Sequence, residues 1–408
     1  MDLILKNAGV LGEREETITD IGIADGNIVA IGAGLSGDGE ILDMDGRLAI
    51  PGFIESHIHL DKACILDRCK SEEGTLDEAI REVAAAKKDF TVADIRARAI
   101  RTLEKCILQG TTRMRAHLEV DPQIGIKSIE AVLPLIAEYA WAIDLEVCVF
   151  PQEGLLNNPG TDELMVEALK RGASIVGGCP YTDSNPRRQI ERVFEMAREF
   201  DVDIDFHLDF DTNPQGMTVS DVCELTETHG YGGRVAIGHV SKLSALTPEQ
   251  LATVGERLAN TGVAVTVLPS TDLYLMGAER DHDIVRGVAP VHRLIRGGVN
   301  CALSTNNLLN PFTPFGDCSM IRMANLYANI GQIGTAAGLR ECLEMVTHRP
   351  ARLMRLKDYG IAVGNPADIV VLDCPSGVAA VQELAIPLFG FKRGRLIFTR
   401  EPAQLHKP

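Results

Sequence analysis

The stretch Pro51-Gly52-Phe53-Ile54-Glu55-Ser56-His57-Ile58-His59-Leu60 is a short apolar run that ends in two alternating histidines. In a β-strand, positions i and i+2 point to the same face, so His57 and His59 can place two imidazoles on one metal ion. Two polar residues on the exposed face of a strand would have the same spacing. The pair therefore indicates either a metal site or a half-exposed strand, and the rest of the chain favours one of them.

Seven more β-branched or apolar runs follow, and helical patterns separate them. Repeated strand-helix units are typical of a parallel sheet covered by helices, and eight of them predict an α/β fold of the TIM type, a (β/α)8 barrel. The predicted strands are residues 49–60, 111–120, 145–152, 174–180, 202–209, 234–240, 263–269 and 299–306. The predicted helices include residues 92–108, 162–171, 188–200 and 248–260.

The two ends of the chain have a different pattern, made of short strands and turns. The Asp25-Gly26-Asn27 turn lies between two alternating runs, which is typical of a β-hairpin. The tail has a similar pattern at residues 366–372 and 391–397. We therefore expect residues 1–50 and 360–408 to form one small β domain beside a barrel of residues 51–359.

Charge and cysteine content limit the partners and the compartment. The 408 residues carry 57 acidic and 40 basic side chains, for a formal charge of -17, which argues against nucleic acid or an anionic membrane as partner. The first residues lack the pattern of a signal peptide, and no apolar run has transmembrane length. The ten cysteines include no Cys-x-x-Cys pair and suit a reducing compartment. We expect a soluble cytoplasmic protein that acts on a small molecule.

Polar side chains collect at the ends of the predicted strands. TIM barrels carry their chemistry at the C-terminal ends of the strands, which meet at one mouth. Five of the ten histidines lie at such ends, and they are His57, His59, His117, His207 and His239. Other polar residues at these ends are Glu119, Gln152, Glu153, Asp209, Thr305, Asn306 and Asn307. This coincidence favours the metal site over the half-exposed strand.

Several motifs together resemble the amidohydrolase superfamily, in the branch of cytosine deaminase and N-isopropylammelide amidohydrolase, over nearly the whole chain. They are residues 51–62 (PGFIESHIHLDK), 73–80 (EGTLDEAI), 115–120 (RAHLEV), 150–154 (FPQEG), 205–207 (DFH), 238–239 (GH), 314–316 (PFG) and 358–368 (DYGIAVGNPAD). This resemblance implies a metal-dependent barrel hydrolase, and barrels of this branch often form homo-oligomers.

By this resemblance, His57, His59 and His207 would be the imidazole ligands of one divalent metal ion with an open position for water. Zinc is the expected metal, and iron, cobalt and manganese suit the same ligands. His239 would polarise the attacked carbon's substituent or help to hold the water, and Gln152 would hydrogen-bond the polar edge of the substrate. The fourth strand ends without a lysine, which implies a mononuclear site without a carbamylated-lysine bridge.

Two catalytic positions depart from the family. The aspartate that ends the eighth strand aligns with Asn306, whose amide can offer a carbonyl oxygen to the metal but cannot act as a general base. The glutamate three residues beyond His207 is replaced by Phe210. Asp209, at i+2 from His207, is our first candidate for the base, or else it orients a ligand histidine. His239 is the second candidate for the base.

The substrate is the least determined part of the expectation. Phe312 aligns with an aromatic position that lines the deaminase pocket, and with Phe210 it indicates a pocket less polar than a pyrimidine needs, unless both only pack in the core. We expect a metal-dependent deaminase or amidohydrolase in which metal-bound hydroxide attacks a C–N bond of a small, heterocyclic nitrogen compound. The alternative is a barrel that lost catalysis with its two acids and only binds.

Overall fold

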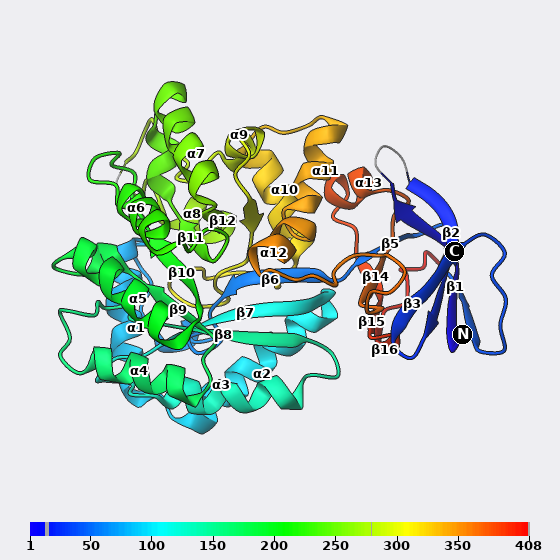
Figure 1. Ribbon diagram of the computed structural model, residues 1–408, viewed down its shortest axis with the longest axis horizontal. Coiled ribbons are helices and arrows are strands. Elements are labelled where there is room, and N and C mark those ends of the chain that lie inside the picture. The colour runs from blue at the N-terminus through cyan, green and yellow to red at the C-terminus, as the bar shows by residue number, and fades with distance from the viewer. Residues whose placement is uncertain (13–15, 279, 407–408) are drawn as a thin grey trace.

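The computed structural model describes residues 1–12, 16–278 and 280–406 of the chain. Within these residues the strands form two sheets of eight, a parallel sheet curled into a barrel and a mixed sheet built from both ends of the chain. The mixed sheet lies at one end of the long axis of the molecule, beside the barrel and its helices (Figure 1). The predicted TIM-type barrel with a smaller β unit from the termini is confirmed.

Each of the eight predicted barrel strands is present. Every neighbouring pair from β6 to β13 is parallel and follows chain order, as expected when a helical connection returns the chain to the same edge. The strands are β6 (Phe53–Ile58), β7 (Thr111–Glu119), β8 (Asp144–Phe150), β9 (Ile175–Gly178), β10 (Asp203–Leu208), β11 (Val235–His239), β12 (Ala264–Val267) and β13 (Cys301–Leu303).

Side chains join the first and last strands of the barrel. The Ser56 amide donates to Ser304 Oγ at 3.0 Å, and the Thr305 amide and hydroxyl donate to the Glu55 carboxylate at 3.0 and 2.6 Å. One parallel bridge, Ile58 to Asn306, completes the seam. The barrel therefore closes at the place where the first histidine pair meets the end of the eighth strand.

Several helices begin at caps that local sequence supplies. Thr91 accepts the Asp94 amide before α2, and Thr247 forms a capping box with Gln250 before α7. The four predicted helices correspond to α2, α4, α5 and α7. The helices are α1 (Leu76–Ala86), α2 (Val92–Leu108), α3 (Lys127–Glu138), α4 (Thr161–Arg171), α5 (Pro186–Phe200), α6 (Val219–His229), α7 (Pro248–Thr261), α8 (Pro269–Leu275), α9 (Val291–Arg296), α10 (Met320–Ile330), α11 (Ala336–Glu344), α12 (His348–Leu353) and α13 (Gly377–Gln382).

The second sheet joins the two ends of the chain. Its parts pair where β5 runs antiparallel to β14. The predicted hairpin forms between β2 and β3, with Asp25 and Gly26 both in the left-handed region, at φ 48° and 77°. The strands are β1 (Leu3–Leu11), β2 (Glu16–Ala24), β3 (Asn27–Gly32), β4 (Glu40–Asp43), β5 (Leu48–Pro51), β14 (Ile369–Leu372), β15 (Pro387–Lys392) and β16 (Arg395–Thr399).

The first predicted strand, residues 49–60, was wrong as a single element. The chain leaves the mixed sheet at Pro51 and enters the barrel at Phe53. Gly52 stands between them with its backbone against Thr112, where an added Cβ would lie 2.2 Å from Cγ2. Only glycine permits this approach. The change of sheet therefore falls at Gly52, and the division into domains at 50/51 and 359/360 stays a prediction.

Each sheet has its own apolar core. The larger cluster fills the barrel and the space beneath its helices, and the smaller one lies against the mixed sheet around Ile21, Ile369 and Phe391. Across residues 1–12, 16–278 and 280–406, no helix combines the length and the apolar character needed to cross a membrane.

Candidate active site

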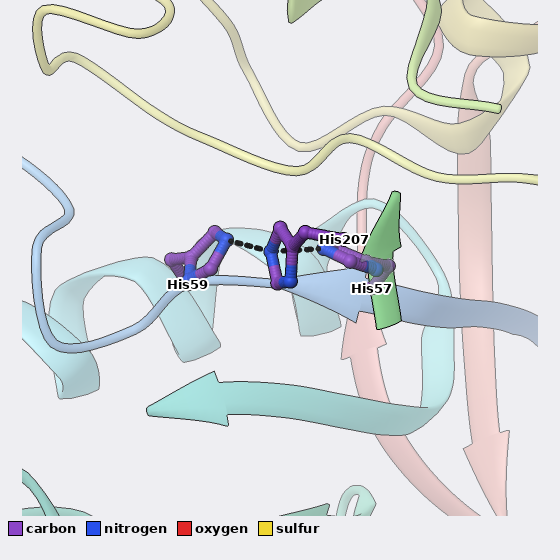
Figure 2. A group of neighbouring side chains, drawn as sticks. All are labelled: His57, His59 and His207. Atoms are coloured by element: carbon purple, nitrogen blue, oxygen red, sulfur yellow. Dashed lines mark hydrogen bonds between the residues drawn. The ribbon is translucent and has the colours of Figure 1, made fainter. Parts of the chain in front are cut away.

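Three histidines converge at the C-terminal mouth of the barrel. His57 is the penultimate residue of β6, His59 lies just beyond that strand, and His207 comes from β10 (Figure 2). His207 Nε2 lies 3.0 Å from His57 Nε2 and 3.1 Å from His59 Nε2. All three side chains are buried. The tertiary structure thus brings the three predicted metal ligands to one point.

The chemistry of this cluster fits a divalent metal ion. Nitrogen ligands at about 2.0–2.1 Å from a tetrahedral metal lie roughly 3.3 Å apart, close to the separations seen here. Burial is the largest cause that lowers the pKa of each histidine well below its usual value, and charge on neighbouring side chains adds to it. The imidazoles are therefore neutral, which is the form that binds metal.

Asn306 lies beside the three histidines. Its backbone amide donates to the His57 backbone carbonyl at 3.0 Å, and its backbone carbonyl accepts the His59 backbone amide at 2.8 Å. The residue has a φ of 65°, which asparagine tolerates better than most residues. Its side-chain Oδ1 is buried without a partner among the described residues. This orphaned oxygen suits the expected metal-ligand role of Asn306, which stays a prediction.

A second layer lies behind His57. The His117 ring stacks on the His57 ring with centroids 3.7 Å apart. Asp205 Oδ1 lies 3.8 Å from His57 Nδ1 and 3.6 Å from His117 Nε2, and Arg115 Nη1 donates to Asp205 Oδ2 at 2.8 Å. Asp205 thus places a negative charge near Nδ1 of a predicted ligand histidine, which favours the tautomer that leaves Nε2 free to bind metal. Sequence analysis assigned no role to Asp205 or Arg115.

His239 ends β11 next to the three-histidine cluster, with its ring centroid 5.6 Å from that of His207. Its Nδ1 forms a 2.6 Å hydrogen bond with Asp272 Oδ1, and Phe210 stacks on its ring at 3.8 Å. Asp272 lies in α8 and is fully buried, and burial raises its pKa although His239 lowers it. Sequence analysis missed Asp272, because it lies in a helix rather than at a strand end.

The contacts of Asp209 support neither role that we expected for it. Its carboxylate accepts the Thr218 amide at 2.9 Å, the Thr218 hydroxyl at 2.9 Å and the Val219 amide at 3.1 Å. None of its hydrogen bonds within the described residues goes to a histidine. The reason is that β10 ends at Leu208 and Asp209 has a φ of 48°, so the strand alternation that would carry its side chain beside His207 stops one residue too early.

Gln152 and Phe312 meet around a buried lysine that sequence analysis did not assign. Lys62 Nζ donates to Gln152 Oε1 at 2.8 Å and to Glu119 Oε1 at 2.7 Å, and lies 4.5 Å from the centre of the Phe312 ring. The pocket that Phe312 was expected to make less polar therefore contains a buried charge. Lys62 follows the histidine pair closely, in His59-Leu60-Asp61-Lys62, and this short spacing could have predicted its place in the site.

A second buried lysine, Lys87, contacts the same Glu119 carboxylate as Lys62. Lys87 Nζ lies 2.7 Å from Glu119 Oε2, 2.8 Å from Asp121 Oδ2 and 2.5 Å from Glu153 Oε1. Burial would lower the pKa of Lys87, but the three carboxylates outweigh it and the pKa is raised. We call Lys62, Lys87, Glu119, Asp121 and Glu153 the lysine network. Although its three carboxylates could suit a cation, the Lys87 ammonium group already lies between them.

The chain is similar to known proteins over almost its full length. Residues 136–407 match the sequence pattern of the amidohydrolase family. The N-isopropylammelide isopropyl amidohydrolase of Pseudomonas sp. (strain ADP) is 30% identical over 98% of this chain and 98% of its own length. The 5-methylcytosine deaminase of Klebsiella pneumoniae with 5-fluorocytosine superposes with a TM-score of 0.94 at 29% identity, covering 100% of both chains. The N-isopropylammelide isopropylaminohydrolase of Burkholderia multivorans gives 0.85 at 25%, covering 97% of both.

Proposed function

Because this chain belongs to the amidohydrolase family and is a hydrolase of carbon–nitrogen bonds, we propose that it cleaves such a bond in a small nitrogen heterocycle. The names of its relatives support this class of substrate, since one acts on N-isopropylammelide and another on 5-methylcytosine. The leaving group is ammonia or an amine. The proposal includes one divalent metal ion, with zinc expected and iron, cobalt or manganese as alternatives.

One observation carries the proposal, namely the convergence of three neutral imidazoles on one point. His57, His59 and His207 would hold the metal through Nε2, and Asn306 would add its unpaired Oδ1. When bound, such a metal supplies the Lewis acidity that activates water at neutral pH. Asp205, held by Arg115, would place a negative charge 3.8 Å from His57 Nδ1, which favours a proton on that nitrogen and leaves Nε2 for the metal.

The remaining side chains bind the substrate and handle protons. Gln152 and Lys62 offer an amide and an ammonium to the polar edge of a heterocycle, and Phe312 offers a ring face. Burial of these groups excludes water and strengthens each hydrogen bond that the substrate makes. His239 lies at the edge of the histidine cluster and is the residue of the site best placed to carry a proton.

The direct test is turnover by zinc-reconstituted protein on pyrimidines, triazines, cyclic ureas and simple amides, followed by release of ammonia or amine. His207→Ala is expected to lose its bound zinc and more than about 10³-fold of its turnover. The matched control is His282→Asn, because His282 is 85% exposed outside the site, and it should retain both. No turnover on any compound by protein that carries its metal would contradict hydrolysis of these classes.

A second candidate function is binding without catalysis. The observation that favours it is the absence of two acids, because Asn306 and Phe210 stand where the family has an aspartate and a glutamate. Metal content does not separate the two functions, since a binding protein could retain its metal. The turnover of Asn306→Asp separates them. Increased turnover indicates an impaired site, whereas unchanged or lower turnover indicates a site rebuilt around the amide.

We further propose that the protein acts in the cytoplasm as a homo-oligomer. The ten cysteines are free thiols and nine of them are buried, which suits a reducing compartment. Light scattering coupled to size-exclusion chromatography measures the number of copies, and a mass of one chain would contradict the oligomer.

A further inference from the structure

The proposed hydrolysis needs a group that takes a proton from water and delivers it to the leaving nitrogen. The amide of Asn306 and the ring of Phe210 cannot do this. Asp209 is held by Thr218 and Val219, and Glu119 by Lys62 and Lys87. The proton must therefore pass through another group at the mouth of the barrel.

We infer, on the basis of the C–N hydrolysis proposed above, that Asp272 is the positioning residue that makes His239 the general base and general acid of this enzyme. His239 Nδ1 lies 2.6 Å from Asp272 Oδ1, and because an ionised carboxylate can only accept, this contact places the proton on Nδ1 and the lone pair on the opposite nitrogen, Nε2. Nε2 makes no hydrogen bond with any residue that the structure describes. It is therefore free to accept a proton from water.

Asp272 is held in a single orientation. Its other oxygen, Oδ2, accepts the Leu268 amide at 3.1 Å, and the residue lies in the first turn of α8. The side chain is fully buried, and His239 is its only side-chain partner among the described residues. A buried carboxylate with one imidazole partner stabilises that imidazole when it becomes positively charged.

Phe210 and the local backbone fix the plane of the His239 ring. Phe210 stacks on it at 3.8 Å with an angle of 29° between the planes. His239 and Val240 both have positive φ, at 68° and 45°, which is costly for the β-branched Val240 and recurs at functional sites. The residue that replaced the family's glutamate thus supports the imidazole instead of carrying a proton itself.

The proton balance is complete with this pair alone. As the water oxygen forms its bond to the substrate carbon, one water proton passes to His239 Nε2. As the C–N bond breaks, the same proton passes from Nε2 to the leaving nitrogen, which departs as ammonia or an amine. The second water proton stays with the product, and Asp272 remains ionised throughout.

The first test is the tautomer of His239 in the zinc-loaded protein, measured by ¹⁵N NMR of labelled histidine and assigned by comparison with His239→Gln. We expect a proton on Nδ1 and none on Nε2 at neutral pH. A proton on Nε2 instead would overturn the inference. This measurement needs neither turnover nor a variant at position 272, so it decides the role of Asp272 even if the proposed hydrolysis fails.

The second test is Asp272→Asn, which is expected to retain zinc and lose about 10³–10⁴-fold of kcat, with a much smaller change in KM, because an amide can stabilise the wrong tautomer. The loss should accompany a changed ¹⁵N pattern of His239. Asp368→Asn is the control, since Asp368 is a buried carboxylate just before β14 that pairs with Lys392, and the variant should change neither kcat nor the ¹⁵N pattern of His239. An active enzyme whose kcat survives Asp272→Asn would overturn the inference and leave the hydrolysis proposal standing.

Discussion

The two sides of the three-histidine cluster differ in how many charged groups they contain. On one side a single carboxylate, Asp272, faces a single imidazole, His239, with the apolar ring of Phe210 behind it. On the other side the lysine network joins two ammonium groups to three carboxylates, so that Glu119 contacts both lysines. The first side has one carboxylate for one imidazole, whereas in the second the three carboxylates outnumber the two ammonium groups and each carboxylate contacts at least one lysine.

Under the proposed function, this difference would separate the handling of a proton from the recognition of a substrate. A catalytic imidazole must change its charge during each turnover, so it needs one partner that tolerates both states. A recognition group must keep its charge and its place, and Lys62 meets this condition for its proposed role because Glu119 and Gln152 both accept hydrogen bonds from its ammonium group. We expect substitutions on the two sides to differ in which quantity they change.

The largest expected effect on the lysine side is on stability. Lys87→Met leaves three carboxylates facing one another without their common partner, and breaking a buried ion pair on one side costs about 3–5 kcal/mol of the free energy of unfolding. Denaturant unfolding measures it. The neighbouring Lys88 is exposed, so Lys88→Met should be neutral within about 0.5 kcal/mol. Equal stability of both variants would mean that the network is not a structural unit.

Lys62→Met sharpens the contrast in kinetics. It removes the charged donor that we propose for the substrate, which is worth about 1.5–3 kcal/mol, so kcat/KM should fall roughly 10–100-fold. The change should lie mainly in KM, because binding is lost equally in ground and transition states. Steady-state kinetics at constant zinc content measures this, with the exposed Lys70→Met as control. A loss confined to kcat would place Lys62 on the chemical side instead.

Asp209→Asn separates the expected base from the one inferred. Because its carboxylate binds the amides of Thr218 and Val219, the variant should lose about 1–2 kcal/mol of stability. Its kcat should change less than about tenfold, far less than for Asp272→Asn. A kcat loss as large as that of Asp272→Asn, with zinc retained, would restore Asp209 as the base.

The smallest expected effect is a pH dependence of stability. Burial, and then the charge of Glu119, raises the pKa of Glu153 from 4.5 to about 7. The folded state therefore binds more protons than the unfolded state between these values, and the free energy of unfolding falls as pH rises through this window. The side chain is 23% exposed, so we expect only about 1 kcal/mol. Glu153→Gln should flatten Tm against pH, and parallel curves for both proteins would contradict this.

Much of the scaffold could be predicted because its signals are local. Alternation and β-branched runs predict the eight barrel strands, and the Asp25-Gly26 turn predicts its hairpin. Local patterns failed where the backbone changed direction. Gly52 divided the first predicted strand between two sheets, and the positive φ of Asp209 ended the alternation on which its expected role depended. At Gly52 the cause is a close approach to Thr112, and at Asp209 it is a positive φ.

The sequence by itself determined the barrel and the histidines at its strand ends, because strand period and element order place these residues at one mouth whatever the details of packing. Only the tertiary structure decided which charged groups face them. Asp272 meets His239 across 33 positions of the chain, and Lys62 meets Gln152 across 90. Such contacts depend on how helices and loops pack over the barrel, and a local sequence pattern cannot predict contacts between residues so far apart in the chain. Local sequence patterns therefore determine the scaffold, while tertiary packing determines which charged side chains pair.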